Sequence, residues 1–211
     1  MRLFSIIGIT QSGKTTTIEA VISELRRRGY SVGSVKEIHF EQFAIDNPTS
    51  NTARHRRAGS ELVTARGYYE TDVLYQSKLP MEQILSNYDY DYVALEGVRD
   101  LAVPTVIAAH CEQEVDQRWS EQVFAITGKL ADRIDEYRGL PALSAVDPQQ
   151  LQQLVDLLEQ QPSEWQPPQQ YQIARDGSRV MLSARQNLLL EQALADCPDG
   201  EIVLIKSGKG E

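Results

Sequence analysis

The sequence predicts an α/β fold in which a mostly parallel, twisted sheet carries helices on both faces. Six short apolar runs have the composition of buried strands, and segments with helical spacing lie between most of them. This alternation favours a parallel sheet because consecutive strands are then joined by right-handed helical crossovers. With 211 residues and 41% hydrophobic side chains, the chain is long enough to bury one such core and to carry a small appendage.

The individual elements follow from these patterns in chain order. An apolar run that leads directly into a glycine-containing loop predicts the first strand, and the amphipathic segment after that loop predicts the first helix. The last helix of the core has Asp147 as its N-cap and Pro148 at its first helical position. The expected strands are residues 3–9, 31–37, 92–97, 105–110, 123–128 and 141–145. The expected helices are residues 14–29, 81–88 and 147–160.

The chain is predicted to have three parts. A core domain is followed by a linker, which is indicated by three prolines in the aperiodic stretch QQPSEWQPPQQ. The remainder predicts a small ββαβ extension, with a hairpin around Asp176-Gly177 and a helix opened by a capping box from Ser183 to Gln186. The predicted boundaries are 1–160 for the nucleotide-binding core, 161–169 for the linker and 170–211 for the extension.

Composition narrows the class of partner. The net charge of −9 argues against a general nucleic-acid or anionic-membrane surface, because phosphate groups recruit basic faces. The two cysteines, Cys111 and Cys197, are far apart in the sequence, which fits a reducing compartment better than a disulfide scaffold. No apolar run approaches the roughly 18 residues that a membrane span needs. We therefore expect a soluble, cytoplasmic protein that binds neither nucleic acid nor a membrane.

The loop after the first expected strand matches the phosphate-binding pattern G-x-x-x-x-G-K-[ST]. Gly8 and Gly13 allow a tight turn that aims successive N–H groups at a phosphate, and the following helix adds the positive end of its dipole. Lys14 is expected to reach the outer phosphates and the Thr15 hydroxyl to ligate Mg²⁺. The pattern predicts a P-loop NTPase. The predicted nucleotide-binding residues are Gln11, Ser12, Gly13, Lys14, Thr15 and Thr16.

A phosphate loop also needs an acid at the end of a nearby strand to hold the hydration shell of the metal. Glu96 is our first candidate, because the apolar run YVAL places it at the mouth of a buried strand. Asp46, in the turn IDNP, is the second, and Glu96 could instead be an ordinary loop carboxylate. The predicted catalytic residues are Lys14 and Glu96, and the predicted metal ligands are Thr15 and Glu96.

The basic segment TARHRRAG predicts a second anion site. If this segment is helical, Arg54 and Arg57 share one face, and Lys36 at the end of the second strand can point at the same mouth. Guanidinium groups match the oxygens of phosphate, so these residues, with Asp46, form the predicted second anion site. Composition alone supports a solvated helix face equally well.

Taken in order, these motifs resemble the MobB family over about residues 2–160. The resemblance rests on the phosphate loop, the strand ending at Lys36, the IDNP turn, RHRRAG and LEGVRD. MobB proteins are GTP-binding accessory proteins of molybdenum cofactor biosynthesis, which act beside the enzyme that attaches GMP to molybdopterin. The resemblance therefore implies GTP and Mg²⁺ as ligands, molybdopterin and the molybdenum cofactor guanylyltransferase as partners, and weak GTPase activity at most.

Site residues carry over only where positions match. The resemblance implies that residues 13–16 hold the nucleotide phosphates, that Glu96 and Thr15 attend the Mg²⁺, and that Arg54 begins the second site. The chain departs from the family at residues 49–52, which read TSNT in place of the usual Gly-Lys-Asp-Ser. It also has Glu37 where the family has histidine.

Two other functions remain open at this stage. A small-molecule kinase would use RHRR as a lid and Asp46 as its positioned acid. A metal-inserting GTPase would need a thiol-rich or histidine-rich site, for which the chain offers two isolated cysteines. For either function or for the accessory protein, a two-fold homodimer is the expected assembly, because it is the commonest oligomer.

Overall fold

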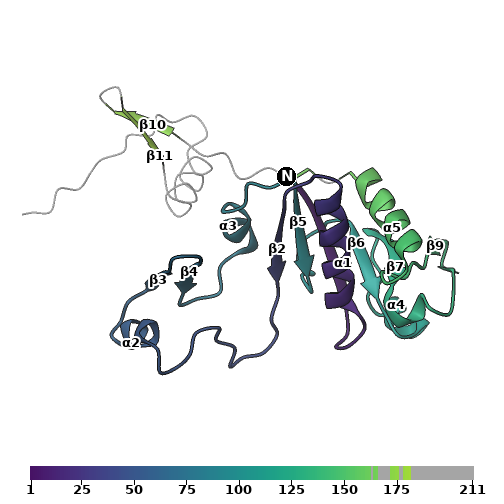
Figure 1. Ribbon diagram of the computed structural model, residues 1–211, viewed down its shortest axis with the longest axis horizontal. Coiled ribbons are helices and arrows are strands. Elements are labelled where there is room, and N and C mark those ends of the chain that lie inside the picture. Colours follow the sequence, from purple (N-terminus) through teal and green to yellow (C-terminus); the bar gives the residue numbers. More distant parts are fainter. Residues whose placement is uncertain (163, 166–171, 176–177, 182–211) are drawn as a thin grey trace, which may run out of the picture. The chain divides into compact units, whose positions relative to one another are not determined.

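The computed structural model describes residues 1–162, 164–165, 172–175 and 178–181. Its centre is a five-stranded sheet in the order β2-β5-β1-β6-β7, in which every neighbouring pair is parallel. This arrangement confirms the predicted α/β fold (Figure 1). The strands are β1 Arg2–Gly8, β2 Val32–Lys36, β5 Tyr92–Glu96, β6 Thr105–Ala108 and β7 Val123–Thr127.

Two long helices cover one face of this sheet. They are α1, Lys14–Arg27, and α5, Pro148–Gln160, and their buried side chains pack with those of β1, β5 and β6 in one core cluster. The Asp147 carboxylate caps α5 by accepting hydrogen bonds from the N–H groups of Gln149 and Gln150, each at 2.9 Å. Burial of this amphipathic face supplies most of the helices' stability, because helices of this length are marginal on their own.

The other face carries shorter elements. The helix α4, Glu112–Asp116, and the 3₁₀ turn η1, Gly128–Leu130, contribute Val115 and Leu130 to a second cluster that contains Ile7 of β1. Helical elements thus lie on both faces of the sheet, as predicted. A pocket lined by Ile7 and by residues after α4 lies on this face.

The prediction that residues 141–145 form a sixth strand of the central sheet is wrong. Its start belongs to a small antiparallel pair of β8, Glu136–Tyr137, with β9, Leu140–Pro141, and it meets β7 through a single bridge between Ile126 and Ala142. Pro141, directly before this bridge, cannot extend the pairing with β7 as a donor because it has no N–H.

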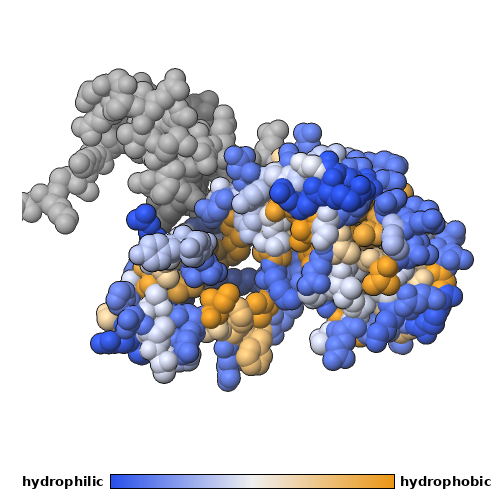
Figure 2. All heavy atoms as spheres, in the orientation of Figure 1, coloured by the Kyte–Doolittle hydropathy of each residue, from blue (hydrophilic) through white to orange (hydrophobic). Residues whose placement is uncertain are grey.

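The segment between β2 and residue 79 contains a helix and a β-hairpin, and the sequence patterns did not predict the two strands of the hairpin. After β2 come α2, Asn51–Arg57, and an antiparallel hairpin of β3, Leu62–Arg66, with β4, Thr71–Tyr75. Figure 2 shows hydrophobic side chains on the surface of this part of the chain. The large exposed hydrophobic residues of this segment are Ile38, Phe40, Phe43, Ile45, Leu62, Tyr68, Tyr69, Val73 and Tyr75.

The remaining described elements belong to a second compact unit. The short helix α3 spans Met81–Leu85, and β10, Gln172–Arg175, pairs antiparallel with β11, Ser178–Met181. The paired strands confirm the hairpin predicted around Asp176-Gly177. The predicted helix from Ser183 and the last predicted strand lie outside the described residues, so the boundaries 1–160, 161–169 and 170–211 stay a proposal. Within the described part of the chain, no helix is long and apolar enough to cross a membrane.

Candidate functional site: a phosphate loop facing a buried carboxylate

The loop between β1 and α1 has a shape that depends on two close approaches. A Cβ atom on Gly8 would lie 2.2 Å from the carbonyl oxygen of Ala108 and 2.6 Å from the Ser12 Oγ. A Cβ atom on Gly128, after β7, would lie 2.3 Å from the Ser12 carbonyl oxygen. All three distances are far below van der Waals contact, so only glycine fits at these two positions. The loop therefore rests on the ends of β6 and β7.

Gly128 is a residue that the sequence reasoning missed. The pair Gly128-Lys129 resembles the end of a phosphate loop but lacks the first glycine, so no phosphate role was predicted for it. In the structure, Gly128 lies against Ser12 and its Cα is 3.4 Å from where a Cβ on Gly13 would stand. The sequence contains no signal for this support because it depends on strand order.

The first turn of α1 is left open for an anion. Gly13 is its N-cap, with φ of 103°, and no side chain caps the free N–H groups. In α5, by contrast, the Asp147 carboxylate satisfies two of these groups. Uncapped N–H groups and the helix dipole together make an anion-binding site. The local geometry is thus what phosphate binding requires.

Lys14 lies folded back over the loop. Its Nζ donates a hydrogen bond to the carbonyl oxygen of Ile9, which also accepts from the Ser12 Oγ at 2.9 Å. Burial lowers the pKa of Lys14 below its ordinary value, the Glu96 carboxylate opposes this, and the Lys36, Arg118 and Arg99 charges add to the lowering. Lys14 is therefore held near the loop by a neutral acceptor that a phosphate oxygen can replace.

The Glu96 carboxylate contacts side chains from α1 and β2. It ends β5, is only 7% exposed, and is in register with Ile6 of β1 on one side and Lys36 of β2 on the other. Its Oε1 accepts a hydrogen bond from the Thr15 Oγ1 at 2.8 Å and from the Lys36 Nζ at 2.9 Å. A buried carboxylate is stable only with such partners. The structure thus brings together the two predicted metal ligands, Thr15 and Glu96.

Hydroxyl and carboxylate oxygens are the ligands that a hard cation prefers, and Mg²⁺ takes one or two protein groups and leaves the rest to water and phosphate. Thr15 and Glu96 fit this requirement. Among the described residues, no group of three His, Cys, Asp or Glu side chains is arranged to hold a metal, so the metal-inserting alternative has no supporting site in that part of the chain.

The predicted second anion site is not assembled as one cluster by the contacts observed. Lys36 lies in the phosphate site, on Glu96. Asp46 instead forms an ion pair with Arg56, at 3.0 Å, and accepts a hydrogen bond from the Ser50 Oγ at 2.7 Å. The hydrogen bond from Ser50 is the main cause that lowers the pKa of Asp46. This carboxylate is engaged in holding the start of α2, which weighs against its role as the acid of a kinase.

The two remaining arginines of that prediction are exposed on α2. Arg57 donates to the carbonyl oxygen of Pro48 at 2.7 Å, and Arg54 makes a long contact of 3.4 Å with the Asn51 Oδ1. Neither forms an ion pair within the described residues. Their role in anion binding stays a prediction. Arg56, which sequence reasoning did not select, is the member of the segment that is paired.

A pocket of about 560 Å³ is lined by residues that follow η1 in the chain and by residues at the start of α5. Its lining includes Asp132 and Ser144, whose Oγ donates to the Asp132 Oδ1 at 3.3 Å. The Gln150 side chain accepts a hydrogen bond from the N–H of Ser144 at 2.6 Å, which fixes this wall. The pocket therefore offers a carboxylate and a hydroxyl to a polar ligand.

A parallel sheet with a glycine loop before α1 and an acid at the end of the adjacent strand defines a P-loop nucleotide-binding protein. Comparison with known proteins specifies the family. A sequence profile of the family described as MobB, molybdopterin guanine dinucleotide synthesis protein B, matches residues 3–129, which is more than half of the chain. The chain belongs to the MobB family.

Individual relatives agree with this assignment. The probable molybdopterin-guanine dinucleotide biosynthesis adapter protein of Bacillus subtilis is 21% identical over 150 residues, 69% of this chain and 87% of that protein. The molybdopterin-guanine dinucleotide biosynthesis adapter protein of Haemophilus influenzae is 25% identical over 167 residues, 74% of this chain and 87% of that protein. The crystal structure of Bacillus subtilis MobB has the same fold, with a TM-score of 0.61 at 19% identity, over 76% of this chain and 100% of that chain.

Proposed function

We propose that the chain binds GTP with Mg²⁺ and supports the attachment of GMP to molybdopterin, with weak GTPase activity at most. The observation that carries this proposal is the meeting of an uncapped phosphate loop with the Thr15 and Glu96 pair in a member of the MobB family. Membership of the MobB family supports the proposed pathway. The geometry of the phosphate loop supports a nucleotide as the ligand.

The phosphate groups are held by the loop in this proposal. The N–H groups of residues 11–16 face the phosphates, and Lys14 exchanges the Ile9 carbonyl oxygen for an outer phosphate oxygen. Thr15 and Glu96 hold the Mg²⁺, which when bound neutralises charge on the outer phosphates. Lys36 orients Glu96 by donating a hydrogen bond to its Oε1 at 2.9 Å.

The preference for GTP is supported by the pocket beyond η1. Asp132 is the last residue of TGKLAD, a loose form of the guanine-reading pattern. A carboxylate accepts hydrogen bonds from the N–H groups on the guanine edge, whereas adenine presents a ring-nitrogen acceptor there and would meet repulsion. Asp132 lies in the pocket with Ser144, so it is available to the base.

An accessory role fits the chemistry at the loop better than rapid turnover. Among the described residues, Glu96 is the one carboxylate that bonds a residue of the phosphate loop. In the proposed site Glu96 serves the metal, so a general base for the attacking water would have to be a second acid, and the described contacts place none on the loop. This arrangement holds a nucleotide and its metal for a reaction that another protein completes.

The proposed partners are molybdopterin, the molybdenum cofactor guanylyltransferase and a second copy of the chain. The exposed apolar side chains between β2 and β4 support an interaction surface, since soluble monomers rarely leave such residues grouped in water. Phe40 is 64% exposed and Ile45 is 78% exposed. A homodimer that covers this segment is the simplest assembly, because closed two-fold symmetry uses one patch twice.

A reconstituted synthesis tests the proposed function. Molybdopterin, Mg²⁺ and a limiting concentration of GTP are incubated with the guanylyltransferase alone, with added wild-type protein and with added Lys14→Ala protein. We expect wild type, and not Lys14→Ala, to raise the yield of the dinucleotide. Equal yields in all three mixtures, with no binding of the protein to the guanylyltransferase or to molybdopterin, would overturn the proposal.

A further inference from the structure

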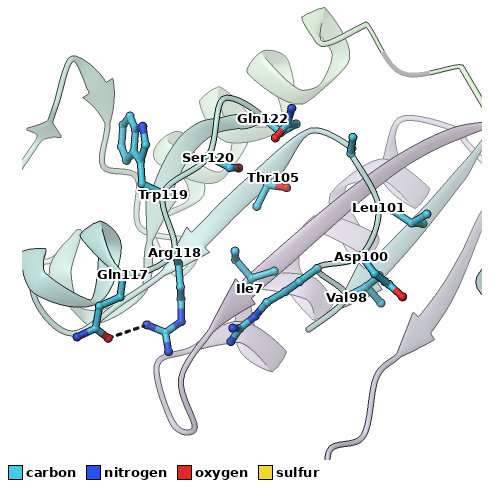
Figure 3. Close-up of a pocket in the computed structure, with 12 residues that line it drawn as sticks. Ile7, Val98, Asp100, Leu101, Thr105, Gln117, Arg118, Trp119, Ser120 and Gln122 are labelled. Carbon is cyan, nitrogen blue, oxygen red and sulfur yellow. Dashed lines mark hydrogen bonds between the residues drawn. The ribbon is translucent and has the colours of Figure 1, made fainter.

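A pocket of about 390 Å³ lies on the α4 face of the sheet. Its walls come from Ile7 of β1, from the loop of residues 98–102 after β5, from Thr105 of β6 and from residues 117–122 between α4 and β7 (Figure 3). Among the described residues, its lining includes none of residues 8–16. It is thus a separate space beside the phosphate loop, within the range of about 300–1,000 Å³ of small-molecule sites.

Two arginines in this pocket, like Arg54 and Arg57 of α2, have no carboxylate partner among the described residues. Arg118 contacts only neutral acceptors, the Glu114 carbonyl oxygen at 3.1 Å and the Gln117 Oε1 at 3.4 Å, and its Nε is buried without a hydrogen-bond partner (Figure 3). Arg99 has no hydrogen bond or ion pair to any described residue. Elsewhere, carboxylates pair with Arg27, Arg28, Arg56 and Arg138.

The pocket adjoins the phosphate loop. Ile7 in its wall directly precedes Gly8, the first residue of the phosphate-binding pattern. The charges of Arg118 and Arg99 also act, as minor causes, to lower the pKa of Lys14. A chain with a net charge of −9 has carboxylates to spare, yet none of the described carboxylates pairs with either arginine. A buried donor without an acceptor costs stability unless a ligand supplies that acceptor.

We propose that this pocket binds the phosphate monoester of a second small molecule, held by Arg99 and Arg118 beside the outer phosphate of the nucleotide. Guanidinium forks match phosphate oxygens, and Arg118 can donate from its free Nε. The apolar side chains of Val98 and Leu101 and the carboxamide of Gln122 suit a ligand body with one apolar face and hydrogen-bonding edges. The inference deepens the proposed function, on which it rests for the existence of a substrate beside GTP.

Inorganic phosphate is the probe, titrated by calorimetry into full-length Lys14→Ala protein, in which the loop site is weakened. We expect saturable binding of one phosphate, at least about tenfold weaker in Lys14→Ala/Arg99→Gln and in Lys14→Ala/Arg118→Gln. Lys14→Ala/Arg26→Gln is the matched control, because Arg26 is an exposed arginine at the far end of α1. Equal affinity in all four proteins, or no binding up to about 10 mM phosphate, overturns the proposal.

A second titration separates the two sources of a phosphate group. Phosphate is titrated into wild type saturated with Mg·GDP and into wild type saturated with a non-hydrolysable Mg·GTP analogue. Binding in both states supports a second ligand, whereas binding only beside GDP assigns the arginines to the third phosphate of the nucleotide and overturns the proposal. If wild type binds no nucleotide but Lys14→Ala still binds phosphate through Arg118, the proposed function fails and this site stands. Arg99 is exposed, so Arg99→Gln tests the site even if Arg118→Gln does not fold.

Discussion

Glu96 is the central residue of the proposed nucleotide site, because it lies where β2 and β5 end together, opposite Ile6 of β1. Thr15 and Lys36 both bond the same oxygen, Oε1. Each neighbour compensates part of the cost of burying the charge. The phosphate loop therefore has a fixed carboxylate in place before any ligand arrives, and preorganisation of this kind lowers the cost of binding.

Glu96→Gln tests this role. The amide keeps the shape and removes the charge that would hold the metal, so we expect the gain in GTP affinity on adding Mg²⁺ to fall about tenfold, equal to about 1.4 kcal/mol. Affinity without Mg²⁺ should change far less. Calorimetry with and without Mg²⁺ measures both, and Glu61→Gln, at an exposed carboxylate of the α2 to β3 turn, is the control. An unchanged Mg²⁺ dependence in Glu96→Gln would rule out the metal role.

Gly128 tests the support beneath the loop. Gly128→Ala places a Cβ against the Ser12 carbonyl oxygen, whereas Gly139 has a similar φ, 77° against 81°, and open space around it. Gly139→Ala should therefore cost only the strain of the left-handed conformation, about 1–2 kcal/mol. Gly128→Ala should lower the free energy of unfolding further and weaken GTP binding, as measured by denaturant titration and calorimetry. Equal losses in the two variants would contradict the clash.

At the scale of elements, the two long helices are joined by charge as well as by their apolar faces. Glu24 of α1 is buried and bonds Arg27 and Arg28, and Arg28 also reaches Asp156 and Glu159 of α5. The pKa of Glu24 is lowered from its ordinary 4.5 to about 2, and the hydrogen bonds from Arg27 are the largest cause. The network therefore depends on Glu24 being ionised.

This network predicts an acid-sensitive step. A carboxylate whose pKa is depressed by folding stabilises the protein fully above its unfolded pKa, and the contribution is lost as the pH falls from about 4.5 towards 2. Glu24→Gln should lower the free energy of unfolding at pH 7 by about 2 kcal/mol, because the three hydrogen bonds to Glu24 lose their charge assistance. Thermal melts of both proteins from pH 7 to pH 2.5 should converge as the pH falls. Parallel curves over that window would contradict a contribution that depends on the ionised Glu24 carboxylate.

The elements also show what could be predicted from the sequence. Four of the central strands, β1, β5, β6 and β7, are apolar runs buried on both faces, so composition alone located them, whereas the edge strand β2 is partly exposed. The hairpin of β3 and β4 was missed because both strands are mostly exposed and carry no clear alternation. Lys36 was grouped with Arg54 because sequence order does not reveal that β2 lies beside β5, where the register sets Lys36 opposite Glu96.

At the scale of the whole molecule, an acidic chain places positive charge in local clusters. The phosphate loop and the pocket with Arg99 and Arg118 lie at adjoining positions on β1, and the segment from β2 to β4 presents apolar side chains to solvent. The sites proposed for ligands and the surface proposed for assembly are therefore different parts of the core. Local clusters, and not the net charge, decide which anions bind.

The exposed segment predicts self-association. Replacing Phe40 and Ile45 together by Ser should shift a dimer towards monomer without loss of the folded core, because both side chains are mostly in solvent. Light scattering across a range of protein concentrations measures the change, and Val146→Ser, at another exposed apolar residue, is the control. A wild-type protein that is monomeric at all concentrations would contradict the proposed homodimer.

Calorimetric titration of GTP and of ATP, each with and without Mg²⁺, into wild type and Lys14→Ala tests the central claim most directly. The account predicts that wild type binds Mg·GTP at least about tenfold more tightly than Mg·ATP, and that removing either Mg²⁺ or the Lys14 ammonium group weakens GTP binding by a similar factor or more. Equal affinity for the two nucleotides would contradict the assignment of Asp132 to the base. Binding that is indifferent to both Mg²⁺ and Lys14 would contradict the nucleotide site itself.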